Sequence, residues 1–97
     1  MKRLFSVLTD DMDHCMFTGS PVVERHHVFG DSRKKASERR GFIAPLRPDL
    51  HPNGAGFKGT KENEEIDRIL KQMCQVYYEE HYGSREDFRK EFGKSYL

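Results

Sequence analysis

The chain has 97 residues, of which 35% are hydrophobic and 34% are charged, and its net charge is +1. This length predicts one domain over residues 1–97. Its hydrophobic core should be small, and small domains often need a metal ion, a partner or oligomerisation for their stability. No apolar run could span a bilayer and the apolar start is too short for a secretory signal, so we expect a cytoplasmic protein without a membrane partner. Two cysteines and no Cys-x-x-Cys pair exclude a four-cysteine zinc ribbon.

The first predicted element is a β-strand over residues 22–29. The run is rich in β-branched residues and is bounded by Pro21 and Gly30. A basic loop follows it, and residues 41–46 form a second extended segment whose proline suits a sheet edge. Two short strands separated by a loop predict an antiparallel hairpin.

The second half of the chain predicts helices. Residues 47–60 are rich in glycine and proline and form a loop that contains His51. A helix follows near residues 61–82, because seven apolar side chains recur at helical spacing: Ile66, Ile69, Leu70, Met73, Cys74, Tyr77 and Tyr78. A short helix begins at Ser84 and stops at Gly93. The predicted fold class is therefore α+β: a hairpin in a ββ-site region (22–60), packed on a long helix, with a short terminal helix (61–97).

The adjacent histidines His26 and His27 are the strongest candidates for a functional site. Neighbours on a strand point to opposite faces, so one imidazole can hold a metal ion while the other moves a proton. Folding of the hairpin can bring His26 or His27 close to His51. The competing interpretation is that these are incidental surface histidines, which are common in small proteins.

The basic excess of the chain concentrates directly after the histidine pair. The sequence favours two interpretations of this basic segment equally. It is either a solvated charged face or a segment that neutralises the phosphates of a nucleic acid. The residues concerned are Arg33, Lys34, Lys35, Arg39 and Arg40.

Taken together, these motifs resemble the small HNH-type (ββα-metal) nucleases of bacteriophages, in the branch related to recombinase-dependent phage nucleases. The matching stretches are 9–15, Glu24-Arg25-His26-His27-Val28-Phe29-Gly30, Ser37-Glu38 before Gly41-Phe42, 46–51, 70–75 and Phe92-Gly93-Lys94-Ser95-Tyr96-Leu97. The resemblance implies an endonuclease that hydrolyses DNA phosphodiester bonds in phage or prophage DNA metabolism, with a recombinase as a possible partner. It also implies that His26 and His51 bind a divalent ion (Mg, Mn, Ni or Zn) and that His27 is the general base.

Three departures from the family pattern support a different function. Thr18 replaces the second cysteine of a Cys-x-x-Cys run, the Asn expected near Gly41 is absent, and Lys58 replaces a further histidine. Lysine donates hydrogen bonds and does not ligate a metal at neutral pH, but it could contact a phosphate. The alternative is thus a catalytically weakened nucleic-acid-binding module on the same fold. A third hypothesis is a small helical interaction protein with incidental histidines.

Overall fold

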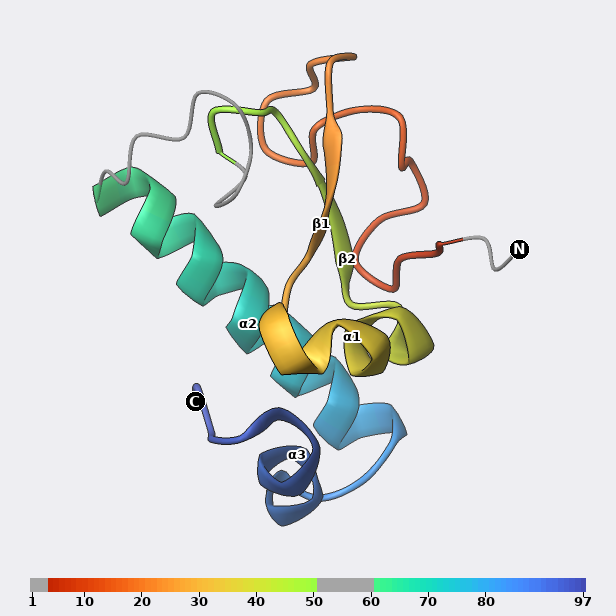
Figure 1. The fold of residues 1–97 in the computed structure, drawn as a ribbon, viewed down its shortest axis with the longest axis vertical. Helices are drawn as coiled ribbons and strands as arrows, with labels where there is room; N and C mark the ends of the chain where they lie inside the picture. Colours follow the sequence, from red (N-terminus) through yellow and green to blue (C-terminus); the bar gives the residue numbers. More distant parts are fainter. Residues whose placement is uncertain (1–3, 51–60) are drawn as a thin grey trace.

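The computed structural model describes residues 4–50 and 61–97. Its elements are β1 (Glu24–His27), a 3-10 turn η1 (Asp31–Arg33), α1 (Lys34–Arg40), β2 (Ile43–Leu46), α2 (Lys61–His81) and α3 (Arg85–Phe92), as Figure 1 shows. The predicted α+β class, the hairpin and the two C-terminal helices are confirmed, and both strands are shorter than predicted. The predicted loop residue His51 lies outside the described residues.

The hairpin consists of β1 and β2 in an antiparallel pair. His26 lies opposite Ala44 and His27 lies opposite Ile43. The N-terminal segment is tied to β2, because the Ser6 hydroxyl donates to the carbonyl oxygen of Ile43 at 2.6 Å. The backbone N–H of Met16 likewise donates to the carbonyl oxygen of Pro45 at 3.1 Å.

The prediction of a loop over the basic residues 33–40 is wrong: seven of them form helix α1. Lysine, alanine, glutamate and arginine all favour helix. The helix ends at Gly41, whose φ of 75° is the left-handed conformation that commonly terminates helices at glycine. The observed order is therefore strand, helix, strand, helix, helix, with α1 inserted inside the predicted ββα arrangement.

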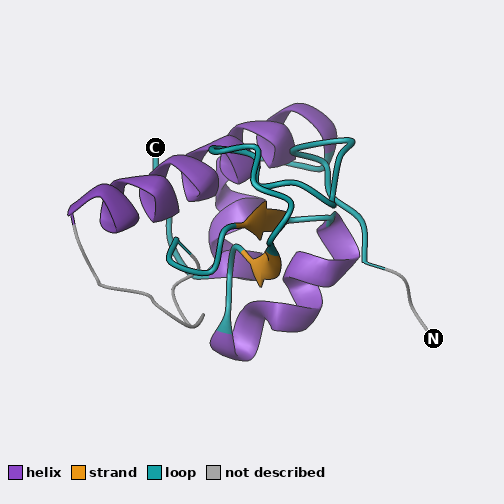
Figure 2. Ribbon diagram, turned by 90° about the horizontal axis from the view of Figure 1, so that it is seen from above, coloured by secondary structure: helices purple, strands orange, loops and turns teal. Residues whose placement is uncertain are grey.

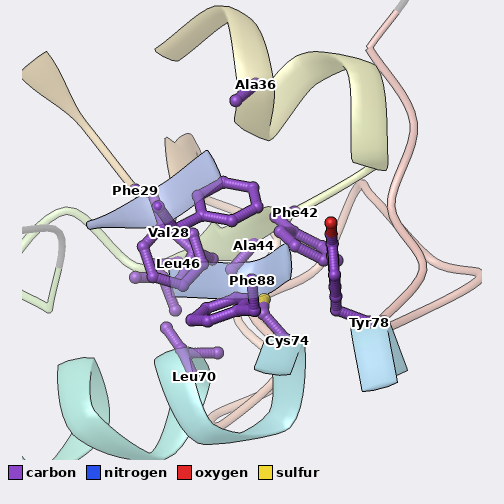
Figure 3. Close-up of a cluster of buried hydrophobic side chains, with 11 residues drawn as sticks. Val28, Phe29, Ala36, Phe42, Ala44, Leu46, Leu70, Cys74, Tyr78 and Phe88 are labelled. Carbon is purple, nitrogen blue, oxygen red and sulfur yellow. The ribbon is translucent and has the colours of Figure 1, made fainter. Parts of the chain in front are cut away.

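Helices cover both sides of the hairpin. Figure 3 shows Leu70 and Cys74 of α2 on one side of the strand residues and Ala36 of α1 on the other. Figure 2, viewed from above, shows the strands enclosed by helices. The predicted apolar stripe of α2 divides accordingly: Leu70, Cys74 and Tyr78 are buried, whereas Met73 is 39% exposed.

The α3 helix completes the core. Its N-terminus has a capping box, in which the Ser84 hydroxyl accepts from the Asp87 N–H at 3.1 Å and the Asp87 carboxylate accepts from the Ser84 N–H at 3.0 Å. Phe88 and Phe92, one turn apart, are buried, and both rings contact Phe29, which follows β1. The predicted α3 is thus confirmed.

We predict that Leu70→Ala lowers the free energy of unfolding by about 2–5 kcal/mol, because Leu70 is 0% exposed and its loss leaves a cavity. Met73→Ala, in the next turn of α2, is the control and should cost clearly less because Met73 is partly solvated. Urea unfolding of both variants measures the difference. Equal losses would show that Leu70 is not a core residue.

Candidate functional site

The two histidines of β1 have different environments. His26 is buried, with 6% of its surface exposed. The His27 side chain is 20% exposed, so its imidazole is accessible to solvent. This difference agrees with the alternation of side chains along a strand. The pair thus lies on the predicted strand, and the structure adds that the His26 ring is inside the protein and the His27 ring is at its surface.

His27 is held by a carboxylate from α1. Its Nε2 lies 2.9 Å from Oε1 of Glu38, which is partly buried. An ionised carboxylate only accepts hydrogen bonds, so Nε2 carries the proton and Nδ1 is left as the acceptor of the neutral ring. A histidine fixed in one tautomer by a carboxylate is the usual arrangement of a general base with its orienting group.

Ser37 fixes the helix that carries Glu38. Its hydroxyl donates to the carbonyl oxygen of Phe29 at 2.8 Å and accepts from the N–H of Phe29 at 3.1 Å. Ser37 is fully buried, and both bonds join α1 to the chain directly after β1. Because Glu38 is the next residue, this contact sets its position relative to His27.

The basic residues of η1 and α1 fall into two groups. Lys34 and Lys35 are exposed at the start of α1, and Arg33 before them is partly buried. Arg39 and Arg40 instead bind Glu91 of α3: Arg40 donates two hydrogen bonds, at 2.9 and 3.0 Å, and Arg39 donates one at 3.1 Å. The arginines at the end of α1 therefore have a structural role that the sequence did not indicate.

Glu91 is the centre of this ion cluster. Burial alone would raise the pKa of the Glu91 carboxyl. Hydrogen bonds from Arg40, Arg39 and the Tyr78 hydroxyl lower it by more, so the pKa of Glu91 lies below its usual value. Arg40 also lies over the Tyr82 ring, 4.5 Å from its centroid. The cluster joins α1, α2 and α3 at one point.

Only one of the two metal ligands predicted from the sequence lies among the residues that the structure describes. His26 is a candidate ligand, whereas His51 and Lys58, which were predicted to contribute a ligand and a phosphate contact, lie outside the described residues. Within residues 4–50 and 61–97, no three His, Cys, Asp or Glu side chains gather as a metal-binding group. The described residues therefore supply one candidate donor, His26, and a neighbouring imidazole, His27, but not a complete ligand set.

Sequence reasoning quoted Ser37-Glu38 only as a stretch that matches the nuclease family and assigned no role to either residue, and it missed Glu91 altogether. A signal for the first two was present: good helix formers over residues 34–40, followed by a glycine, predict a helix that ends at Gly41. Glu91 gave no comparable signal, because its partners Arg39 and Arg40 lie about 50 residues away along the chain.

We predict that Glu91→Gln lowers the free energy of unfolding at pH 7 by about 1–3 kcal/mol, since charged hydrogen bonds to a mostly buried group are lost. The pKa of Glu91 is lowered in the folded protein, so its contribution is complete above the unfolded-state pKa and is lost as the pH falls through the folded-state pKa. The difference between variant and wild type should therefore shrink on acidification. Glu86→Gln, at an exposed 3.7 Å pair with Arg89, is the control. A difference that is independent of pH would contradict this account of Glu91.

Comparisons of the chain with family models, with curated proteins and with solved structures find no match. The similarity to HNH-type nucleases is therefore a prediction from the motifs quoted above. No helix among the described residues has both the length and the apolar character needed to cross a membrane. The geometry around His27 thus provides the main basis for assigning a function.

Proposed function

We propose that the protein is a metal-dependent endonuclease that hydrolyses DNA phosphodiester bonds, with His27 as its general base. The observation that carries this proposal is the hydrogen bond between His27 Nε2 and Glu38. It supplies an oriented imidazole at the surface of a strand, next to a helix with exposed lysines. Phosphodiester hydrolysis needs both a base for water and cations for the phosphate backbone.

In the proposed reaction, Nδ1 of His27 accepts a proton from the attacking water. Glu38 keeps the ring in the tautomer that leaves Nδ1 unprotonated, and its charge stabilises the imidazolium that forms. Ser37 holds α1 against the end of β1, so the ring and the carboxylate keep their separation. Glu38 thereby takes the orienting role for which the sequence offered no Asn near Gly41.

A divalent ion completes the proposal. His26 is the described candidate ligand, and we propose that His51 supplies the second imidazole. When bound, such an ion would offset the charge that develops on the phosphate and on the leaving oxygen. The candidate ions are magnesium, manganese, nickel and zinc: imidazole ligands suit nickel and zinc, and water ligands suit magnesium and manganese.

The DNA contact is proposed for the exposed start of α1. Lys34 and Lys35 are exposed and form no ion pair with the described residues, so they can approach a phosphate backbone at little cost. Arg33, and Lys58 from outside the described residues, are proposed to extend this surface. Arg39 and Arg40 can contribute charge, but each contact to DNA competes with Glu91.

We predict that His27→Ala lowers the cleavage rate about 10²- to 10⁴-fold without weakening DNA binding, because it removes the base alone. Glu38→Gln should cause a smaller loss, since an amide oxygen still accepts from Nε2 but lacks the charge. His26→Ala should abolish metal binding. The control is His14→Ala, at an exposed histidine that also pairs with a carboxylate, Asp11, at 2.8 Å. Plasmid nicking with Mg²⁺, Mn²⁺, Ni²⁺ and Zn²⁺ in turn, beside calorimetry of metal binding, measures these effects.

If the wild type binds DNA but cleaves it with none of these ions, the alternative of a nucleic-acid-binding module replaces the enzyme. Normal cleavage by His27→Ala would contradict the assignment of the base. If the chain binds neither metal nor DNA, the nucleic-acid function as a whole is wrong.

We also predict that changing Lys34 and Lys35 to Ala weakens DNA binding and flattens its dependence on salt by about one unit per lysine lost from the interface, because fewer counterions are released. Changing Arg39 and Arg40 to Ala should flatten the salt dependence too, but it should also destabilise the fold through Glu91. Lys90→Ala and Lys94→Ala, near the C-terminus, provide a matched control of equal charge. An unchanged salt slope for the Lys34 and Lys35 double variant would show that this face is only solvated.

A further inference from the structure

Arg25 shares one face of β1 with His27. Side chains alternate along a strand, so residues two apart point to the same side, and His26 between them is buried on the other side. Across the hairpin, Arg25 lies opposite Pro45 and His27 lies opposite Ile43. The side chains of Arg25 and His27 are 43% and 20% exposed. The strand therefore presents a guanidinium and an imidazole to solvent on one face.

The spacing of these two side chains suits neighbouring phosphates of a nucleic acid. Two residues of a strand span about 6.5 Å. Phosphates on one DNA strand follow each other about every 3.4 Å along the helix axis. In Figure 1, β1 runs towards α1, so Arg25 lies on the side of His27 that is away from α1. A DNA strand whose phosphate is attacked at His27 can therefore reach Arg25 within about two nucleotides.

Asp13 of the N-terminal segment holds the Arg25 side chain loosely. Nη2 of Arg25 lies 3.6 Å from Oδ1 of Asp13, which is beyond hydrogen-bonding distance, and the Asp13 side chain is 84% exposed. Ion pairs this exposed contribute little, so another anion can replace the carboxylate at small cost. Arginine suits a phosphate in particular, because its planar guanidinium can donate two parallel hydrogen bonds. The Asp13 carboxylate thus occupies a group that could bind a phosphate more tightly.

The surroundings of this pair are polar and acidic. Arg25 and Asp13 line a hollow of about 300 Å³ together with Ser6, Thr9 and Asp10. Among the described residues that line it, Arg25 is the one cation, and Asp10 and Asp13 are both acidic. A DNA backbone that continued past Arg25 into this hollow would meet like charges, which oppose binding. The DNA contact on this face should therefore end at Arg25.

We propose that Arg25 binds a DNA phosphate next to the one attacked at His27, and that Asp13 competes with this phosphate for the guanidinium. The inference rests on the proposed function for its ligand, DNA, but it does not require cleavage. Arg25 is then a substrate-binding residue, and Asp13 lowers the affinity for DNA without contacting it. If the pair only tied the N-terminal segment to β1, the effect of Asp13 on DNA binding would not depend on Arg25.

The experiment measures binding of the full chain to a labelled DNA duplex by fluorescence anisotropy, without added metal and over a range of salt concentrations. Arg25→Ala should weaken binding and flatten the salt dependence by about one unit, because one phosphate contact is lost. Arg25→Lys should keep most of the salt dependence, since the charge remains. Asp13→Asn should tighten binding about two- to fivefold, as expected for loss of an exposed competing pair. Arg85→Ala and Asp67→Asn, at ion pairs of α3 and α2, make the same charge changes and should have smaller effects.

The double variant separates competition from a general effect of charge. Asp13→Asn should tighten DNA binding in the wild type but not in Arg25→Ala, because the guanidinium is then absent. An equal effect in both backgrounds, or an unchanged salt dependence for Arg25→Ala, overturns the inference. If the wild type binds DNA but cleaves it with none of the four ions, the enzyme is refuted and these binding results still decide the role of Arg25. A chain that binds no DNA overturns both.

Discussion

The contact between Ser37 and Phe29 is the constraint on which the rest of the structure depends. One buried hydroxyl satisfies both the N–H and the carbonyl group of Phe29, which follows β1. Buried backbone groups are costly to leave unpaired, so α1 is held in one position against the strand. The direct consequence is that Glu38, the next residue, meets His27 at hydrogen-bonding distance.

The same helix is anchored at its other end by charge. Arg40 and Arg39 bind Glu91, which also accepts from the Tyr78 hydroxyl, so α1, α2 and α3 meet at one carboxylate. A short helix of seven residues is unstable alone, and these non-local contacts supply the stabilisation that propensity does not. In the basic segment, Arg39 and Arg40 at the C-terminal end therefore stabilise the fold, whereas Lys34 and Lys35 at the N-terminal end are exposed.

The sequence predicted the parts of the fold whose signals are local. The α2 helix follows from its apolar period, α3 from Ser84, its paired phenylalanines and Gly93, and the hairpin from two short β-rich runs. The α1 helix was missed because Ala36 is its only buried apolar side chain, so no periodic stripe marks it. Its position depends on the contacts of Ser37 with Phe29 and of Glu91 with the arginines of α1. These contacts join residues that are distant along the chain, so they cannot be inferred from a local pattern.

For the candidate site too, the sequence predicted the local feature, the histidine pair, but not the non-local contact that holds it. The histidine pair was predicted on a strand with its rings on opposite faces, and the structure places both residues on β1; that His26 is buried and His27 partly exposed is a finding of the structure. The orienting carboxylate was not predictable, because Glu38 reaches His27 only through the helix that the sequence did not reveal. The proposed second ligand, His51, belongs to the glycine- and proline-rich segment outside the described residues.

The most direct test of this account is the tautomer of His27, measured from the ¹⁵N chemical shifts of the imidazole in the neutral ring. The account predicts that Nε2 is protonated in the wild type and that Nδ1 is not, because Glu38 accepts from Nε2. In Glu38→Ala, the ring should relax to a mixture of tautomers. A wild-type ring protonated at Nδ1, or an unchanged mixture in both proteins, would contradict the claim that α1 orients His27.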